Sequence, residues 1–150
     1  MLKIGDKAPD FELRDTNGNL VRLSKLKGKE IVLYFYPKDL TPGCTVEACN
    51  FRDDYDDYNK KGVLVFGVSL DNEEKHKKFT EKHDLPFPLL SDTEIKVSKA
   101  YGVYGEKSFL GKKYFGINRT TFVIDKKGFI KHVFEKVNPK NHSKEVLEII

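Results

Sequence analysis

The chain holds two cysteines, Cys44 and Cys49, in a segment that can make the first of them reactive. Thr41 is a preferred residue for capping the start of a helix, and the proline after it suits the first helical position. Cys44 then falls at the third position of the helix, where unpaired amides and the helix dipole stabilise an anion. Because the thiolate is the nucleophilic form of cysteine, this segment predicts a thiol that ionises readily and attacks electrophiles.

Ionisation alone supplies only part of a fast thiol reaction. A free thiol is already a few per cent thiolate at neutral pH, so complete ionisation gains roughly 30-fold, or about 2 kcal/mol. The remaining rate must come from groups that hold the attacked molecule and stabilise its departing charge. Two candidates are the hydroxyl of Thr41, three residues before Cys44, and Arg119, a cation at the head of an expected strand.

Cys49 poses a geometric problem for any disulfide with Cys44. Five residues along an ideal helix separate the Cα atoms by about 8.6 Å and turn the side chains about 140° apart. A disulfide needs Cα atoms within roughly 7 Å and side chains that converge. If the two cysteines pair, the first turns of the helix must therefore unwind.

Other interpretations of the cysteines are weaker. Two small buried residues on a helix would have no chemistry, but the Thr-Pro-Gly sequence places Cys44 at the anion-stabilising end. Cys-x4-Cys differs from the Cys-x-x-Cys of thiol-disulfide oxidoreductases, and it matches structural zinc spacing poorly. We therefore expect no metal, and we expect all four histidines at the surface: His76, His83, His132 and His142.

The elements that position the cysteine segment follow from hydrophobic patterning. Residues 30–36 and 63–69 are apolar runs without alternation, which is typical of strands covered on both faces. An Asn-Gly pair between short alternating runs predicts a hairpin near the N-terminus. The remaining expected elements are a helix over 42–58 with Val46, Cys49, Tyr55 and Tyr58 facing inward, a helix over 72–83, a strand at 89–90, a helix over 94–101, a loop over 102–116, a hairpin of 120–125 with 129–134, and a helix from Ser143.

This order predicts an α/β protein with a thioredoxin-like fold. A mixed central sheet is flanked by helices, with an added N-terminal β-hairpin. The length of 150 residues suits one domain with a substantial core, and no linker or repeat divides the chain. We therefore expect residues 1–150 to form a single domain.

Composition and charge argue against several functional classes. The net charge of +4 comes from 27 basic and 23 acidic residues that are dispersed along the chain, whereas nucleic-acid binding favours a concentrated basic face. The acidic run 53–57 is expected to be a solvated helix face. No apolar run reaches the about 18 residues of a membrane helix, and the start lacks the apolar stretch of a secretory signal. We expect a cytoplasmic protein with no nucleic-acid partner and no membrane, in which cysteines stay reduced unless redox chemistry is their role.

The motifs resemble those of the peroxiredoxins. Pro37-x-x-x-Thr41-x-x-Cys44 matches the signature Pro-x-x-x-Thr/Ser-x-x-Cys of that family. The longer Thr41-Pro42-Gly43-Cys44-Thr45-x-Glu47-x-Cys49 is similar to the peroxiredoxin Q subfamily, also called bacterioferritin comigratory protein. The likeness covers nearly the whole chain, from Gly5-Asp6-x-Ala8-Pro9-Asp10-Phe11 to Asn118-Arg119-Thr120-Thr121-Phe122-Val123-Ile124-Asp125.

The resemblance implies a thiol peroxidase that reduces hydrogen peroxide and organic hydroperoxides without a cofactor. Cys44 would attack the peroxide and become a sulfenic acid, and Cys49 would resolve it as an intramolecular disulfide. Thioredoxin or a similar dithiol reductant would regenerate the thiols. The family includes monomers and dimers, so we expect a monomer or weak dimer. Some members of the subfamily lack the nearby second cysteine.

The resemblance also assigns roles around the thiol. Thr41 and Arg119 match the positions that hydrogen-bond the peroxide and the thiolate, and Pro37 matches the residue that shields the pocket. Glu47 matches a carboxylate that orients the arginine, although an exposed helix glutamate would look the same in the sequence. The alternative to an enzyme is a redox-sensing or chaperone-like binding protein that the same disulfide would switch.

Overall fold

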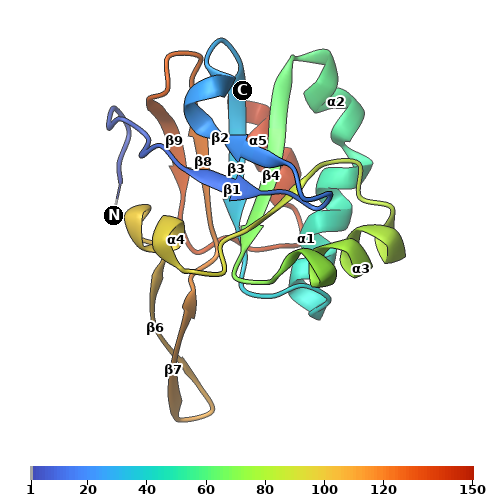
Figure 1. The fold of residues 1–150 in the computed structure, drawn as a ribbon, viewed down its shortest axis with the longest axis vertical. Coiled ribbons are helices and arrows are strands. Elements are labelled where there is room, and N and C mark those ends of the chain that lie inside the picture. Colours follow the sequence, from blue (N-terminus) through green and yellow to red (C-terminus); the bar gives the residue numbers. More distant parts are fainter. Residues whose placement is uncertain (1) are drawn as a thin grey trace.

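The computed structural model describes residues 2–150, which fold around a seven-stranded mixed sheet (Figure 1). The strand order is β2-β1-β5-β4-β3-β8-β9. The strands are β1 (Glu12–Arg14), β2 (Leu20–Arg22), β3 (Glu30–Phe35), β4 (Val63–Ser69), β5 (Leu89–Ser91), β6 (Tyr104–Phe109), β7 (Lys112–Ile117), β8 (Thr120–Ile124) and β9 (Ile130–Phe134). The helices are a 3-10 turn (Leu23–Leu26), α1 (Pro42–Asp53), α2 (Tyr55–Lys60), α3 (Glu73–His83), α4 (Lys96–Ala100) and α5 (His142–Ile149).

Strand β3 lies near the middle of the sheet and carries the cysteine segment at its end. It pairs in parallel with β4 and antiparallel with β8. Its side chains alternate between two hydrophobic cores: Ile31, Leu33 and Phe35 face one, and Val32 and Tyr34 face the other. Both sets are buried, which is why the sequence of this strand shows no polar alternation.

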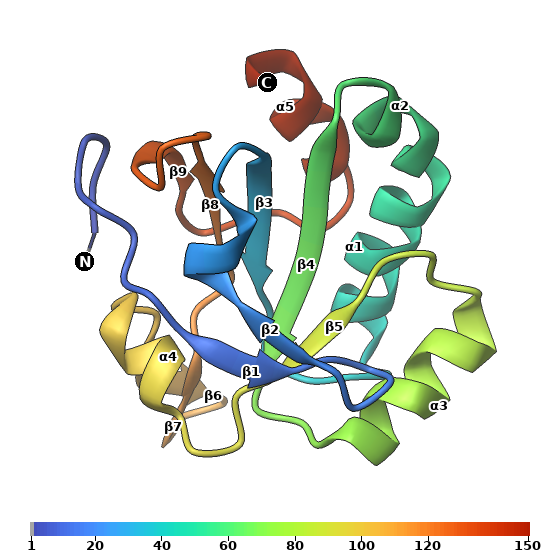
Figure 2. The same cartoon turned by 45° about the horizontal axis from the view of Figure 1, so that its top comes forward.

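Helices cover both faces of the sheet, as Figure 2 shows with the sheet turned. Buried side chains of α1, α2, α3 and α5 join one core, and those of α4 join the other. The N-terminal hairpin extends the sheet, because β1 pairs antiparallel with both β2 and β5. The predicted thioredoxin-like fold, with its mixed sheet and added hairpin, is confirmed.

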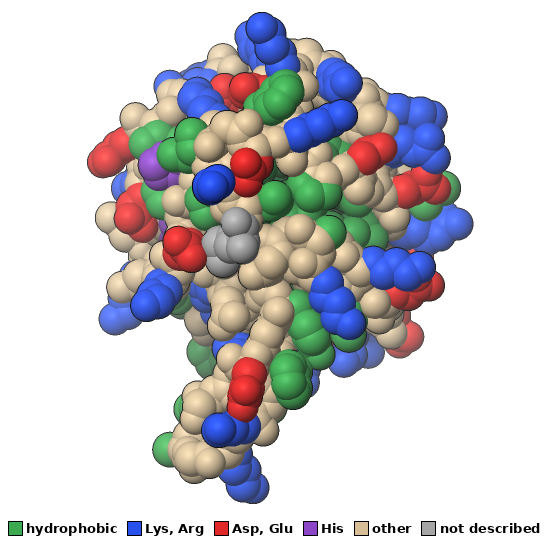
Figure 3. Space-filling model, turned by 90° about the vertical axis from the view of Figure 1, so that its left-hand side faces the viewer, with side chains coloured by type: hydrophobic (Ala, Val, Ile, Leu, Met, Phe, Trp, Pro, Cys, Tyr) green, Lys and Arg blue, Asp and Glu red, His purple; other side chains and the backbone are tan. Residues whose placement is uncertain are grey.

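The expected loop over 102–116 is wrong, because most of it forms the hairpin β6–β7. Six residue pairs join the two strands, from Tyr104 with Ile117 to Phe109 with Lys112. Leu110 and Gly111 both have positive φ, 50° and 79°, which is the backbone of a tight hairpin turn. The hairpin projects from the body of the molecule (Figures 1 and 3), so neither of its faces shows the apolar alternation of a packed strand.

The predicted inward face of the helix after the cysteines is also partly wrong. The helix breaks at Asp54 into α1 and α2, and Val46 is 42% exposed. The buried positions of α1 are Cys44, Glu47, Ala48 and Phe51, with helical spacing of three and four residues. The inward face was mispredicted because one of its residues is Glu47, and a glutamate is normally expected at an exposed position.

The surface mixes both signs of charge. Figure 3 shows one face on which lysine and arginine side chains alternate with aspartate and glutamate. Among the helices of residues 2–150, none has the length and apolar character needed to cross a bilayer.

Candidate active site

The end of β3 and the start of α1 place Cys44 at the first turn of a helix. Thr41 has extended backbone angles, φ −79° and ψ 153°, and Pro42 begins the helix. The first helical hydrogen bond runs from the Thr45 amide to the Thr41 carbonyl at 2.9 Å. Cys44 is therefore the third helical residue, as predicted, and its side chain is only 1% exposed.

Arg119, just before β8, reaches Cys44 from the strand next to β3. It lies between β7 and β8, 75 positions along the chain, and its Nη2 donates a hydrogen bond to Cys44 Sγ at 3.3 Å. A guanidinium this close to a buried sulfur stabilises the thiolate by charge as well as by hydrogen bonding. The structure thus brings together two residues that the sequence could name but not join.

Glu47 binds the other end of the same guanidinium. Arg119 Nη1 donates to Glu47 Oε1 at 2.6 Å, and Glu47 lies one helical turn after Cys44. Glu47 is 1% exposed, and its Oε2 has no hydrogen-bond partner among the described residues. Burial raises the pKa of this carboxyl to about 7, and the charge of Arg119 opposes that rise without cancelling it.

The charge on Arg119 is secured by its two neighbours. Burial disfavours the guanidinium, but Glu47 and Cys44 together outweigh burial and raise the pKa of Arg119. Gly43 allows this close approach, because a Cβ at that position would lie 3.3 Å from Arg119 Nη2. The arginine is therefore a fixed cation between a carboxyl group and the thiol.

Thr41 and Pro37 lie in the loop between β3 and α1. The Thr41 hydroxyl does not cap the helix, although the sequence predicts a cap residue here; it donates to the Lys38 carbonyl at 2.8 Å. That bond leaves the hydroxyl oxygen with lone pairs free to accept another hydrogen bond. Pro37 is half-buried and opens the loop directly after Tyr36.

Cys49 lies further along α1 and is half-buried. Both cysteines are free thiols on one continuous helix, so the predicted conflict between helical geometry and a disulfide applies to this state. The next residue, Asn50, fastens the helix to the segment before α5, because its Nδ2 donates to the Pro139 and Lys140 carbonyls at 3.1 and 2.8 Å. Unwinding of α1 that extends to Asn50 breaks these bonds.

The prediction that all four histidines lie at the surface is wrong for two of them. His76 and His142 are buried at 0% and 1% exposure, whereas His83 and His132 are half-buried. His142 Nε2 bonds the Thr121 hydroxyl at 2.7 Å, and burial lowers the pKa of this imidazole. Within residues 2–150, no three histidine, cysteine or acidic side chains gather as a metal site would require.

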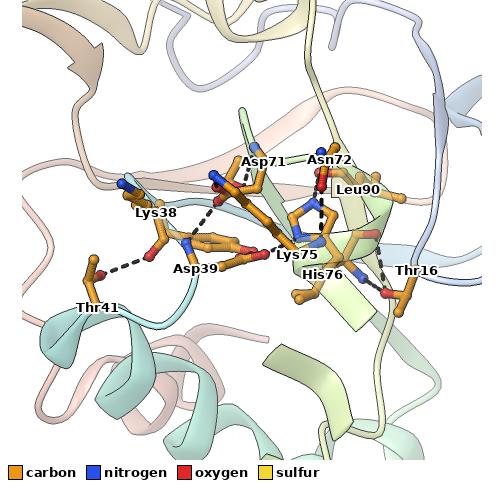
Figure 4. A network of polar contacts seen from close by, with 12 residues as sticks. Thr16, Lys38, Asp39, Thr41, Asp71, Asn72, Lys75, His76 and Leu90 are labelled. Atoms are coloured by element: carbon orange, nitrogen blue, oxygen red, sulfur yellow. Dashed lines mark hydrogen bonds and ion pairs between the residues drawn. The ribbon is translucent and has the colours of Figure 1, made fainter. Parts of the chain in front are cut away.

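Sequence reasoning missed a buried polar network behind the Pro37–Thr41 loop. Figure 4 shows Asp39 of the loop facing His76 of α3, with Asp71 and Lys75 beside them. These residues are scattered in sequence and belong to no motif. Two features of the loop appear only in three dimensions. Leu40 has a positive φ, 65°, and the Tyr36 hydroxyl lies within hydrogen-bond distance of Asp39 Oδ1.

Lys107 of the β6–β7 hairpin was also missed. Its Nζ donates to the Ile117 carbonyl at 2.8 Å, and burial, then the charge of Arg119, lower its pKa. The aromatic residues of this region divide between core and surface. Tyr101 is fully buried, Tyr104 is half-buried, and the exposed ones are Phe109, Tyr114 and Phe115.

Comparison with known proteins gives one consistent family. The model of the AhpC/TSA family matches residues 4–133. Peroxiredoxin Bcp of Bacillus subtilis is 51% identical over 149 residues, covering 99% of this chain and 95% of the relative. Peroxiredoxin Bcp of Escherichia coli is 50% identical over 146 residues, covering 97% and 94%.

Solved structures agree with the sequence relatives. A cysteine-to-serine mutant of PrxQ from Xylella fastidiosa superposes with a TM-score of 0.93 at 32% identity, covering 99% of this chain and 94% of that one. The bacterioferritin comigratory protein of Xanthomonas campestris, described in connection with alkyl peroxide reduction, has a TM-score of 0.87 at 35% identity, covering 92% and 88%.

Proposed function

The chain belongs to the AhpC/TSA family and is a peroxidase of the peroxiredoxin Bcp type, and from this premise we propose that Cys44 is the residue that attacks the peroxide. One observation carries the proposal: the buried Cys44 Sγ accepts a hydrogen bond from Arg119 at 3.3 Å at the first turn of α1. Cys49, on the same helix, has no comparable cation beside it among the contacts of the described residues.

In the first step the Cys44 thiolate attacks one oxygen of the peroxide. The S–O bond forms as the O–O bond breaks, so sulfur is oxidised to a sulfenic acid and the peroxide is reduced. The departing oxygen leaves as water from hydrogen peroxide, or as an alcohol from an organic hydroperoxide, after taking up a proton. The Arg119 guanidinium and the helix amides lie where negative charge moves from sulfur to the departing oxygen.

Thr41, Pro37 and Glu47 support this step by position. Thr41 retains lone pairs that can accept a hydrogen bond from a bound peroxide, and Pro37 would shield the thiol, as its match to the family signature implies. Glu47 holds Arg119 in place through the 2.6 Å contact. Hydrogen peroxide and organic hydroperoxides are the proposed substrates, the latter in line with the alkyl peroxide activity named for the Xanthomonas relative.

In the second step Cys49 resolves the sulfenic acid. Its thiol displaces the sulfenic oxygen as water, and an intramolecular Cys44–Cys49 disulfide forms once α1 has unwound. A thioredoxin-like dithiol then reduces this disulfide by thiol exchange and restores both thiols. Over the first two steps, one hydroperoxide and the two protein thiols are converted to one disulfide, one alcohol (or water) and one water.

Intact-mass analysis after one equivalent of hydrogen peroxide tests the two steps. The wild type should lose two hydrogens without forming an intermolecular link, and repeated peroxide consumption should appear with thioredoxin and its reductase. A protein that stops after one equivalent per chain with every dithiol tried would instead support the redox-sensing alternative. Unchanged mass with peroxide would contradict the proposal altogether.

A further inference from the structure

The loop that joins β3 to α1 is held by a buried network that the two steps above do not use. His76 Nδ1 on α3 lies 2.6 Å from Asp39 Oδ2 in the loop (Figure 4). The Tyr36 hydroxyl, at the end of β3, donates to Asp39 Oδ1 at 2.5 Å. All three side chains are buried, so these bonds form out of contact with water.

A second anchor holds the same loop by its backbone. The Asp39 amide donates to Asp71 Oδ2 at 2.8 Å, and the Ser69 hydroxyl donates to the same oxygen at 2.7 Å. Leu40, the next residue, has φ 65°, a conformation that a residue other than glycine adopts only when its surroundings hold it there. Thr41 follows directly, and its hydroxyl bonds the Lys38 carbonyl of the same loop, so the anchors hold the segment from which that hydroxyl projects.

The chemistry of the hydrogen bonds sets the number of protons on the His76–Asp39 pair. His76 Nε2 lies 3.1 Å from the Leu90 carbonyl oxygen, which can only accept, so Nε2 carries a proton. A second proton must lie between Nδ1 and Asp39 Oδ2, because two lone pairs facing each other at 2.6 Å in a dry site would repel. Whether that proton rests on nitrogen or oxygen, the pair shares it and is neutral as a whole.

The other titratable groups around the pair come from three elements. Tyr36, the residue after β3, bonds Asp39 directly. Asp71, after β4, bonds the Asp39 amide, and its Oδ1 lies 3.9 Å from Lys75 Nζ of α3. Strand β5 contributes the Leu90 carbonyl. Lys75 thus faces Asp71, whereas the groups that bond the His76–Asp39 pair directly are the Tyr36 hydroxyl and the Leu90 carbonyl.

We propose that the His76–Asp39 pair is a positioning element of the peroxidase, whose hydrogen bond clamps the loop carrying Pro37 and Thr41 to α3. The proposal rests on the function proposed above, since it takes peroxide attack at Cys44 as the step that is served. A displacement of about 1 Å in a positioning group can cost about 100-fold in rate, so a loosened clamp has a measurable effect.

Two substitutions of Asp39 distinguish loss of the shared proton from loss of the hydrogen bonds. In Asp39→Asn, the amide nitrogen can donate to a neutral imidazole while the amide oxygen still accepts from Tyr36, so the loop stays held without a shared proton. Asp39→Ala removes both bonds. Val97→Ala on α4 is the matched control, because it opens a cavity in the other hydrophobic core and leaves the loop untouched.

The decisive comparison sets the rate of the peroxide reaction against the rate of alkylation of Cys44 by iodoacetamide, which makes no use of a peroxide-binding loop. We expect Asp39→Ala to slow the peroxide reaction about 10- to 100-fold while alkylation changes less than about threefold. Asp39→Asn should recover most of the peroxide rate, and Val97→Ala should alter neither rate beyond about threefold. Equal losses in both reactions, or none in the peroxide reaction, would overturn the proposal.

Nitrogen-15 NMR of the His76 ring tests the clamp without any activity. The wild type should show a slowly exchanging, far-downfield proton from the hydrogen bond between His76 Nδ1 and Asp39 Oδ2, and Asp39→Ala should lose it. Its absence from the wild type would overturn the shared proton. If the wild type consumed no peroxide while this resonance was present, the proposed function would fail and the catalytic role of the clamp would fall with it.

Discussion

Two turns of helix α1 carry the same functional group in different surroundings. Cys44, in the first turn, is 1% exposed and accepts a hydrogen bond from Arg119 at 3.3 Å. Cys49, further along, is half-buried and lies among residues that hold the helix to the C-terminal segment. We therefore expect the reactivity of Cys44 to depend on the helix start and on the segment between β7 and β8 that carries Arg119, not on the cysteine alone.

The two cysteines also place opposite demands on the rigidity of α1. The first turn is fixed by Pro42, by the Arg119–Glu47 pair and by the anchored loop before it. A Cys44–Cys49 disulfide requires that this same helix unwind. In the proposed cycle the first step thus needs a folded α1 and the second an unwound one. Each prediction below changes one side of that balance.

Arg119→Met should have the largest effect on the side of Cys44. It keeps most of the apolar stem and removes the cation, so the peroxide reaction should slow about 100- to 1000-fold, as measured by stopped-flow kinetics. The substitution also leaves Glu47 buried without its partner and lowers stability. The double variant Arg119→Met/Glu47→Gln should regain stability but not rate; recovery of both would make Arg119 a structural residue.

Glu47→Gln should change the pH dependence of stability. The pKa of Glu47 is 4.5 in the unfolded chain and about 7 in the folded protein. As pH rises from about 4.5 to 7, the unfolded chain releases the proton that the folded protein keeps, so the free energy of unfolding falls by up to about 3 kcal/mol. The variant lacks this titration. Its free energy of unfolding, relative to that of the wild type, should therefore increase between pH 5 and pH 8.

Urea denaturation of the reduced proteins across that range measures the effect. Glu74→Gln is a suitable control, because this glutamate is exposed on α3 and its ion-pair partner, Lys78 at 3.8 Å, is exposed as well. A constant difference between Glu47→Gln and the wild type at every pH would show that Glu47 is ionised throughout.

Thr41→Val should slow the peroxide reaction about 10-fold by removing the hydroxyl at similar size. Because that hydroxyl makes one hydrogen bond, to Lys38, stability should fall by only about 1 kcal/mol. Thr41→Ser keeps the hydroxyl and should keep most of the rate. Similar rates for the valine and serine variants would remove Thr41 from the reaction.

Asn50→Ala should have the smallest effect, and it acts on the side of Cys49. Loss of the two bonds to Pro139 and Lys140 makes α1 easier to unwind, so disulfide formation after peroxide attack should speed up about threefold to tenfold. Peroxide attack itself should keep its rate. The rate is measured by quenching the reaction at intervals and determining the intact mass of the protein in each sample. Slower disulfide formation in Asn50→Ala would contradict this prediction.

The sequence predicted the parts of the fold that obey local rules. The run 30–36, the Thr-Pro helix start and the N-terminal hairpin each follow from patterning or turn chemistry within a few residues. The β6–β7 hairpin was missed because only its last residue, Ile117, joins a hydrophobic core, so no apolar alternation marks its strands.

The site was predictable only where a motif or a cap marked it. Cys44 follows from its place in the helix, but its distance to Arg119 depends on how β8 aligns beside β3. Asp39 and His76 carry no local signal, because a buried histidine and a surface histidine look alike in sequence until their partners are known. Charged residues in general are the ones whose burial sequence rules misjudge, as Glu47 illustrates.

The central claim, that the two thiols of α1 do different work, is tested most directly by single-turnover kinetics on the two single cysteine variants. Reduced Cys49→Ser should react with hydrogen peroxide at the wild-type rate and gain one oxygen, on Cys44. Reduced Cys44→Ser should react at least about 1000-fold more slowly and keep its mass over the same time. Equal rates for the two variants, or oxygen gained by Cys49 in Cys44→Ser at the wild-type rate, would contradict the account.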